Sequence, residues 1–260
     1  MAAFLLSAHL PAIILVSWGR NTMRHPFFAT LSAAALAMAG TIATAEAASI
    51  HVRPTGIELQ APAAASVLTL TNKGREMITA QIRVFRWKQV GGRDVLEPTR
   101  DVVASPPILR MRPGRENVIR VVRVTKRPVK GEESYRLIID QIPDKKRKGV
   151  GVVFAMRYSI PVFFHDRGAT PPRITWKAAR KGRTLVLTAS NAGTRHERIA
   201  KLKVVNGRGK SFVISRGLAG YVLGNSTRVW KVRTRVPMTG VITIKGQGIN
   251  GPFSKKVRIR

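Results

Sequence analysis

The chain has 260 residues, enough for one large domain or two small ones, and either arrangement buries a substantial core. Hydrophobic residues make up 44% and charged residues 23%, a balance that excludes collagen-like, low-complexity and disordered proteins. Lys and Arg number 46 against 13 acidic residues, so the net charge of +33 favours polyanions, anionic membranes or acidic proteins as partners. The absence of cysteine excludes disulfides, thiolate catalysis and cysteine-bound metal.

Residues 1–47 have the pattern of a signal peptide, with the true start expected at Met23. After Met23 a short basic region precedes the apolar stretch 27–42, and Ala45-Glu46-Ala47 places small residues where a signal peptidase reads. We therefore predict cleavage after Ala47 and export, most simply to a bacterial periplasm. No later apolar run reaches the roughly 20 residues that a spanning helix needs, so the mature chain is predicted not to span a membrane.

From residue 48 onward, short alternating segments separated by Gly, Pro and Asn replace any helical periodicity, which predicts an all-β protein. A first domain, residues 48–166, is expected to form one seven-stranded sandwich. Its predicted strands are 50–59, 66–72, 78–88, 108–111, 117–125, 135–142 and 150–164.

Residues 167–173 form the predicted linker, because Gly168, Pro171 and Pro172 cannot continue a strand ladder. A second domain, residues 174–260, repeats the strand pattern. Its predicted strands are 174–178, 184–190, 199–205, 212–214, 221–223, 229–236, 241–245 and 253–259. Two immunoglobulin-like β-sandwich domains of roughly 100 residues each account for the length.

Alternation along these strands also predicts which side chains are buried. Leu185, Leu187 and Ala189 share one face of a strand, and Trp87 and Trp230 are expected in sandwich cores, where large aromatic residues are common.

The chain carries no recognisable catalytic or metal-binding constellation. No serine occupies a Gly-x-Ser-x-Gly elbow, and His51, His165 and His196 of the mature chain lack the spacing of zinc ligands. The run 246–251 has the glycine spacing of a dinucleotide-binding loop, but Pro252 and a strand follow it, so it is predicted to be a glycine-rich hairpin. We therefore assign no catalytic residue, metal or cofactor, and we expect no enzyme.

The densest basic run, 145–148, has two interpretations. It is a nucleic-acid or heparin patch, or it is a solvated loop between two strands. The loop is favoured because the run lacks interleaved aromatic residues on which bases stack, so no specific nucleic-acid partner is predicted.

Several segments match one protein family in order and spacing over nearly the whole mature chain. They are 68–72, 82–87, 105–107, 112–114, 118–120, 135–137, 142–143, 157–163, 221–223 and Trp230. On these residues the chain resembles the periplasmic chaperones of the chaperone–usher pathway, which assist the assembly of bacterial pili. Segment 158–163 is most like the branch that serves archaic, sigma-type or spore-coat-like fimbriae. The resemblance implies two immunoglobulin-like domains in a boomerang arrangement around a cleft.

The last strand of the first domain, within 149–161, has apolar residues on both faces. Val152, Phe154 and Met156 fall on one face, and Tyr158 continues it. The resemblance implies that this strand is inserted into a pilus subunit, an immunoglobulin-like domain that lacks its final strand. On that interpretation these four residues form the subunit-binding donor strand. The alternative is that all of them pack within the chain's own sandwich.

The best-studied family members hold the carboxylate at the subunit's C-terminus with an arginine in the first strand and a lysine late in the donor strand. These positions fall at Gly56 and Pro161 here, and neither side chain binds a carboxylate. Arg53, Arg110 and Arg157 are the candidate anchors, because a guanidinium can hold a carboxylate with two hydrogen bonds. Each has a solvated or locally paired arginine as its alternative.

The family's ion-pair network between the two domains is only partly recoverable. Glu132 or Glu133 is a candidate for its acid, but His165 stands where an arginine is expected and Asn250 replaces the second acid. No network is assigned.

The sequence thus predicts a periplasmic chaperone that binds unassembled pilus subunits and delivers them to an outer-membrane usher. The alternative is an exported basic β-sandwich that binds polyanions at the cell envelope. Salt separates the two, because polyanion binding weakens steeply with salt, whereas ladder hydrogen bonds and buried side chains persist.

Overall fold

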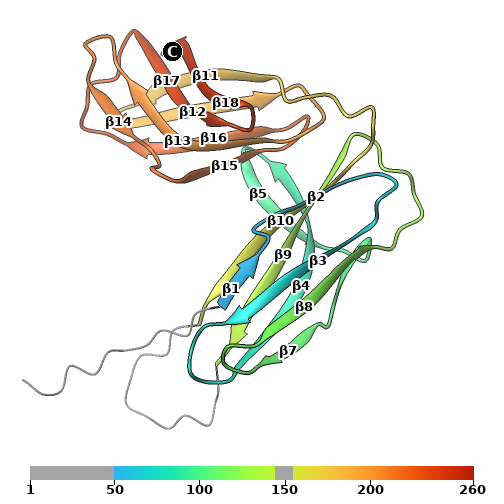
Figure 1. Ribbon diagram of the computed structural model, residues 1–260. Coiled ribbons are helices and arrows are strands. Elements are labelled where there is room, and N and C mark those ends of the chain that lie inside the picture. Colours follow the sequence, from blue (N-terminus) through green and yellow to red (C-terminus); the bar gives the residue numbers. More distant parts are fainter. Residues whose placement is uncertain (1–49, 144–154) are drawn as a thin grey trace, which may run out of the picture. The chain divides into compact units, whose positions relative to one another are not determined.

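The computed structural model describes residues 50–143 and 155–260, and every regular element within these two ranges is a β-strand (Figure 1). The predicted signal peptide, 1–47, and the basic run 145–148 lie outside the described residues. Within the two described ranges there is no helix long and apolar enough to cross a membrane.

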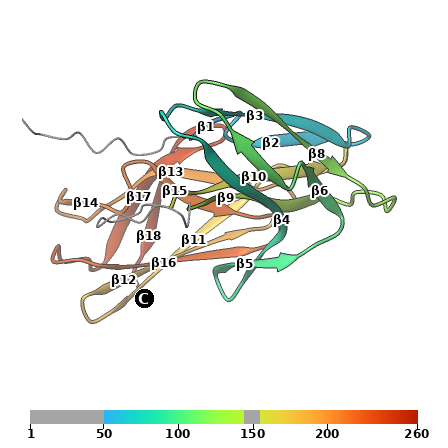
Figure 2. The same ribbon diagram turned by 90° about the horizontal axis from the view of Figure 1, so that it is seen from below.

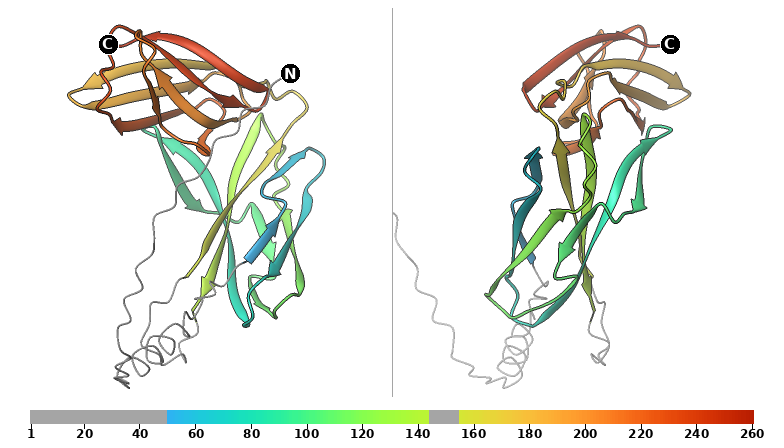
Figure 3. Two further views of the ribbon diagram at one scale, coloured as in Figure 1. Left: turned by 60° about the vertical axis from the view of Figure 1, so that its left-hand side comes forward. Right: turned by 90° about the vertical axis from the view of Figure 1, so that its right-hand side faces the viewer.

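The first ten strands form a sandwich of two sheets. Its strands are β1 Ile50–Arg53, β2 Ile57–Gln60, β3 Ala65–Asn72, β4 Ile78–Val90, β5 Arg93–Pro98, β6 Val102–Ser105, β7 Ile108–Met111, β8 Glu116–Arg123, β9 Glu132–Ile142 and β10 Arg157–His165. One sheet has the order β1-β3-β8-β6. The other has the order β2-β10-β9-β4-β5, with β7 also pairing with β4. Figure 3 gives two further views of these strands.

The remaining eight strands form a second sandwich. They are β11 Ile174–Lys181, β12 Thr184–Asn191, β13 Glu197–Val205, β14 Ser211–Val213, β15 Leu218–Val222, β16 Thr227–Arg233, β17 Val241–Gly248 and β18 Gly251–Arg258. One sheet has the order β11-β12-β16. The other has the order β14-β13-β17-β18, with β15 also pairing with β13 (Figure 2).

In its described residues the first sandwich has ten strands, where seven were predicted. The predicted strand 50–59 is two strands, because Pro54 and Gly56 interrupt it and the chain changes sheets there. β1 pairs with β3 in one sheet, and β2 runs parallel to β10 in the other. Strands β5 and β6 were not predicted. Gly91 and Gly92, both with positive φ, form the tight turn from β4 into β5. The paired glycines are a hairpin signal, but β5 was missed because its sequence is mostly polar.

Each sandwich encloses its own hydrophobic core. The first core takes Leu68 and Ile119 from one sheet and Leu137 from the other, all fully buried. The second core contains Leu185, Leu187 and Ala189 as predicted, together with Trp230. Trp87 is buried as expected but belongs to neither core. It packs with Phe163, Leu223 and Tyr221 in a separate cluster to which both sandwiches contribute.

The glycine-rich hairpin is confirmed. β17 and β18 pair along their whole length, and Gly248 lies opposite Gly251 at the turn. A strand therefore follows the glycines, where dinucleotide binding needs a helix.

Candidate functional site

One side of β10 is partly unpaired. β9 pairs with β10 along its full length, from Arg157 to His165. On the opposite side β2 pairs only with the segment Val162 to His165. Among the described strands, none pairs with residues 157–161 on that side, which we call the open edge of β10. Unpaired backbone groups of this kind are a template for another strand.

The side chains of β10 alternate between the sandwich's own core and its outer face. Ile160, Val162 and Phe164 are buried in the first core, and Tyr158 packs against it. The Tyr158 hydroxyl accepts a hydrogen bond from the Ile50 amide at 3.2 Å. Tyr158 thus contributes to the chain's own packing.

Met156 precedes β10 and extends its pairing. Its carbonyl accepts a hydrogen bond from the Gln141 amide at 2.9 Å, while its side chain is 44% exposed. Val152 and Phe154, the other two predicted donor-strand residues, lie outside the described residues. Met156 is therefore the described member of that set with an accessible apolar side chain.

The three candidate anchor arginines do not converge. Arg53 is exposed on β1, and Arg110 is exposed on β7 in the other sheet. Arg157 is exposed and forms an ion pair with Asp140, which Arg83 also contacts at 2.6 Å. Burial raises the pKa of Asp140, but hydrogen bonds from Arg157 and Arg83 outweigh it and hold that pKa below its ordinary value.

A cavity of 480 Å³ opens beside the start of β10. Its lining is partly charged and partly apolar, because it includes both the Asp140 ion pairs and the exposed Met156 side chain. The lining residues are Gln81, Arg83, Asp140, Gln141, Ala155, Met156 and Arg157.

The two positions that resemble the family's anchor positions lie against each other. A Cβ atom placed on Gly56 would be 3.4 Å from Cγ of Pro161, an ordinary van der Waals contact. The two positions are thus neighbours in space, but neither residue supplies a cation.

Arg136 on β9 supplies a cation at this place. It lies directly opposite Pro161, its Cζ atom is 3.7 Å from the centroid of the Trp87 ring, and the Tyr221 ring centroid is 5.3 Å away. Such stacking of a guanidinium on aromatic rings is favourable. Burial lowers the pKa of Arg136. Sequence reasoning missed this residue, because its alignment with Pro161 depends on a strand register that the sequence does not display.

The Arg136 guanidinium is largely unpaired. Within the described part of the chain it makes one hydrogen bond, a long one from Nη1 to the Ser159 carbonyl at 3.5 Å. Among the described residues, no carboxylate lies within ion-pair distance of it, although an arginine side chain has five N–H donors. A partly buried cation with free donors beside an open strand edge is suited to an incoming carboxylate.

Contacts between the sandwiches resolve the choice between Glu132 and Glu133. The Glu132 carboxylate accepts hydrogen bonds from the His196 amide at 3.0 Å and from its Nδ1 at 2.8 Å. The His196 ring stacks on Phe163 with ring centroids 3.6 Å apart. Glu133 instead stays within the first sandwich and pairs with Arg123 at 2.8 Å. Glu132 therefore links the two sandwiches.

The other position considered for this network, His165, is peripheral. Its Nε2 lies 3.9 Å from Glu58, which pairs with Arg195 of the second sandwich. Gln89 adds backbone contacts, accepting from the Leu223 amide at 3.0 Å and donating to the Tyr221 carbonyl at 2.8 Å. The contact between the sandwiches thus combines aromatic packing with charged and amide groups.

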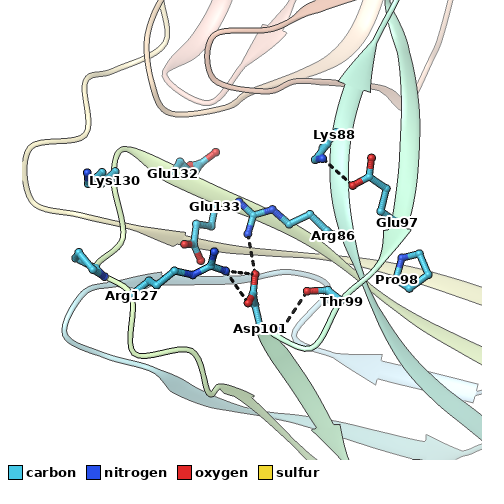
Figure 4. A pocket seen from close by; sticks show the side chains of 11 residues that line it. Arg86, Lys88, Glu97, Pro98, Thr99, Asp101, Arg127, Lys130, Glu132 and Glu133 are labelled. Atoms are coloured by element: carbon cyan, nitrogen blue, oxygen red, sulfur yellow. Dashed lines mark hydrogen bonds and ion pairs between the residues drawn. The ribbon is translucent and has the colours of Figure 1, made fainter.

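A larger cavity, of 720 Å³, lies on the first sandwich and is lined mainly by charged groups (Figure 4). Asp101 accepts hydrogen bonds from Arg127 at 2.8 Å and from Arg86 at 3.5 Å. The Tyr135 hydroxyl donates to Glu133 at 2.9 Å. These charges satisfy one another, so the cavity has the character of a structural ion-pair network. In the part of the chain that the structure describes, no group of His, Cys, Asp and Glu residues is placed to hold a metal ion.

The described residues thus form two β-sandwiches, and β10 of the first has an open strand edge. Residues 49–169 match the family described as pili and flagellar-assembly chaperone, PapD N-terminal domain. The match covers the first sandwich and the first residues after β10.

A curated relative is the uncharacterized fimbrial chaperone YhcA of Escherichia coli strain K12. It is 28% identical over 76 residues, which cover 29% of this chain and 34% of YhcA. The match thus spans about a third of that relative's length.

Solved structures share the two-sandwich fold. A chain in the CsuC-CsuE chaperone-tip adhesion subunit pre-assembly complex, from archaic chaperone-usher Csu pili of Acinetobacter baumannii, aligns with a TM-score of 0.63 and 24% identity. The alignment covers 82% of this chain and 100% of that one. A chain in the complex of the Salmonella enterica SafA pilin with the SafB chaperone aligns with a TM-score of 0.55 and 16% identity. That alignment covers 80% of this chain and 95% of the other. These likenesses confirm the predicted all-β fold of two immunoglobulin-like domains.

Proposed function

We propose that this protein is a chaperone that binds unassembled pilus subunits by lending them the edge of β10. The observation that carries the proposal is the open edge at residues 157–161, flanked by the exposed Met156 side chain and by the unpaired Arg136 guanidinium. The family of the first sandwich supports it, because that family is described as assembly chaperones.

Strand addition explains how the edge binds a subunit. A strand of the subunit pairs with the free backbone groups of β10, and these ladder hydrogen bonds tolerate many client sequences. Met156 and, in the segment outside the described residues, Val152 and Phe154 fill the groove left by the missing strand. Each buried side chain of this size contributes about 1.5–3 kcal/mol.

Arg136 anchors the subunit's C-terminal carboxylate in this proposal. The residue lies opposite Pro161, where the open edge meets the segment that β2 covers. A carboxylate that reaches the end of the edge therefore meets free N–H donors on a cation already held by Trp87. Partial burial strengthens the resulting charge-assisted hydrogen bonds. Arg136 thereby replaces the cations absent at Gly56 and Pro161, and it displaces Arg53, Arg110 and Arg157 as the preferred anchor.

The cellular setting follows from the same proposal. The complex is released at an outer-membrane usher, where a neighbouring subunit's strand replaces β10, and the chaperone works in the periplasm without a cofactor. Among the structural neighbours, the CsuC-CsuE complex is a pre-assembly complex of archaic chaperone-usher pili, which supports assignment to that branch.

Co-expression of the full chain with a pilus subunit tests the proposal. Met156→Glu places a charge in the subunit's groove, and Arg136→Gln removes the anchor, so we expect each to reduce co-purified subunit at least tenfold relative to wild type. Matched controls are Val90→Glu, at a side chain that is 61% exposed, and Arg112→Gln, at an exposed arginine outside the open edge. Full recovery of the subunit with both Met156→Glu and Arg136→Gln would refute strand donation at this edge.

A further inference from the structure

The second sandwich carries an extreme charge imbalance. Residues 174–260 contain 20 Lys and Arg residues and a single acid, Glu197, a net charge of +19. Glu197 is already engaged, because its Oε1 accepts hydrogen bonds from the Ile249 amide at 2.7 Å and the Arg198 amide at 3.0 Å. The imbalance is therefore not relieved within this sandwich.

Part of this charge lies on the outer face of one sheet. Lys203 on β13 lies directly opposite Lys245 on β17. Lys256 on β18 is the diagonal neighbour of Lys245, because Ser254 lies opposite Lys245. Arg258 follows on the same side of β18. All four side chains are exposed, and we call them the lysine face.

The lysine face points away from the core. The neighbouring residues Leu202, Val204 and Ile244 are fully buried, and side chains alternate between the two sides of a strand. Among the described residues, no carboxylate forms an ion pair with Lys203 or Lys245. Like charges directly opposite on neighbouring strands destabilise a sheet, so folding alone gives no reason for this pair.

The surroundings of the lysine face fit a flat anionic surface. Val213 lies opposite Lys203 and is 47% exposed, and Val241 lies opposite Arg258 and is 44% exposed. Lysines beside small exposed aliphatic groups on one sheet face match lipid headgroups and the upper edge of a bilayer.

Nucleic acid fits the lysine face less well. Binding of single strands needs exposed aromatic rings for base stacking. The aromatic residues of these strands turn inward: Phe253 stacks on Trp176 at 5.8 Å, and Phe212 packs against the second core. A sheet face also lacks the projecting helix or ribbon that enters a DNA groove.

We propose that the lysine face adsorbs to the surface of a bilayer that contains anionic phospholipid. Its positive charges attract the phosphate groups of the lipids without insertion of any segment. This activity is separate from subunit binding, because it uses a different sandwich and none of the residues at the open edge. The protein thereby concentrates at a membrane surface while it carries a client.

Vesicle sedimentation tests the proposal with the full chain. The probe is phosphatidylcholine vesicles with and without phosphatidylglycerol, at low and at physiological salt. We expect binding only to the phosphatidylglycerol vesicles, with a strong decrease as salt rises. The triple variant Lys203→Gln, Lys245→Gln and Lys256→Gln is expected to lower the partition coefficient about a hundredfold.

The matched control removes the same charge from the other sheet of the same sandwich. Lys177, Lys181 and Lys231 are exposed there, and their change to Gln is expected to lower partitioning by about threefold or less, because these residues lie on the opposite sheet and do not contact a bilayer bound at the lysine face. Circular dichroism verifies that both variants fold.

Three outcomes overturn the proposal. One is an equal loss of vesicle binding in the two triple variants, which means that net charge alone matters. Another is no binding of wild type to anionic vesicles. The third is duplex DNA or inorganic phosphate displacing the vesicles at equal ionic strength. Retained subunit co-purification in the lysine-face variant separates this result from any failure of strand donation.

Discussion

The two sandwiches hold the end of a central strand in the same way but differ in their balance of charges. Each ends a central strand with a buried asparagine followed two residues later by glycine: Asn72 with Gly74, and Asn191 with Gly193. In both, the asparagine side chain oxygen accepts the glycine amide at 2.9 Å, and its amide group donates to backbone carbonyls. The two domains thus share one device for holding a strand end.

Their charges follow different rules. Residues 48–166 have 22 basic and 11 acidic residues, and several of the acids bind cations within the sandwich, such as Glu133 and Asp140. Residues 174–260 have 20 basic residues and one acid. The first sandwich therefore uses ion pairs as part of its own structure. The second depends on its apolar core and backbone ladders, and its arginines Arg195 and Arg228 pair with acids of the first sandwich, Glu58 and Asp94.

The largest effect on stability is expected from removing the buried asparagine that holds a strand end in each sandwich. Asn191 donates to the carbonyls of Arg195, Val222 and Leu223 and accepts from the amides of Arg173 and Gly193. Asn191→Ala leaves these buried groups unpaired and is expected to lower the free energy of unfolding by about 3 kcal/mol or more.

The equivalent change in the first sandwich sharpens this result. Asn72 makes fewer such hydrogen bonds, so Asn72→Ala is expected to cost less than Asn191→Ala, at about 2 kcal/mol. Urea denaturation of both variants measures the difference. A larger loss from Asn72→Ala than from Asn191→Ala contradicts the argument.

The next effect concerns the internal ion pairs of the first sandwich. Burial raises the pKa of Glu133, but hydrogen bonds from Arg123 and Tyr135 outweigh it, so the folded-state pKa lies below the ordinary value. A depressed carboxyl pKa stabilises the folded state above the unfolded pKa of about 4.3, and this contribution disappears as the pH falls through the folded-state value. Glu133→Gln is therefore expected to cost about 2 kcal/mol near neutral pH and progressively less below about pH 4.

Urea titrations of wild type and Glu133→Gln across this pH range measure the change. A difference between the two proteins that stays constant down to about pH 3 means that Glu133 does not titrate as the structure implies.

A smaller effect on stability is expected at the proposed anchor. Arg136 stacks on Trp87 but makes no ion pair among the described residues. Arg136→Gln is expected to change the free energy of unfolding by about 1 kcal/mol or less while it strongly reduces subunit recovery. Thermal unfolding and co-purification of the same preparation test this combination. A large loss of stability assigns Arg136 a structural role instead.

The smallest effect is expected from a variant that introduces an ion pair into the second sandwich, of the kind found in the first. Lys245→Glu places a carboxylate directly opposite Lys203. An opposite-charge cross-strand pair in place of a like-charge one is expected to raise the free energy of unfolding by about 0.5 kcal/mol. The control Lys255→Glu changes the same net charge where Ile244 lies opposite. An equal gain from both variants attributes the effect to net charge.

Local pattern predicted much of the fold because alternation and turn residues are local properties. Strand β3 and the β17–β18 hairpin lie close to where the sequence predicted them, and the buried residues of β12 alternate as predicted. The division into β1 and β2 was missed, since a continuous run of strand-forming residues does not reveal that the chain changes sheets.

The candidate site was less predictable because it depends on contacts distant in sequence. Met156 was identified from alternation. Arg136 was not, because its importance comes from lying opposite Pro161 and on Trp87. Trp87 itself was expected in a core, whereas it lies among residues of both sandwiches. Glu132 was separated from Glu133 only by its contact with His196.

The break between β1 and β2 also sets how much of β10 a partner can use. β2 begins at Ile57 and covers β10 only from Val162 onward, so the crossing at residues 54–56 determines where the vacant stretch stops. A crossing placed earlier in the chain would cover more of β10 and shorten the available ladder. In the proposed function, the length of β10 available to a subunit strand is therefore set by where β1 ends and β2 begins, and not by β10 itself.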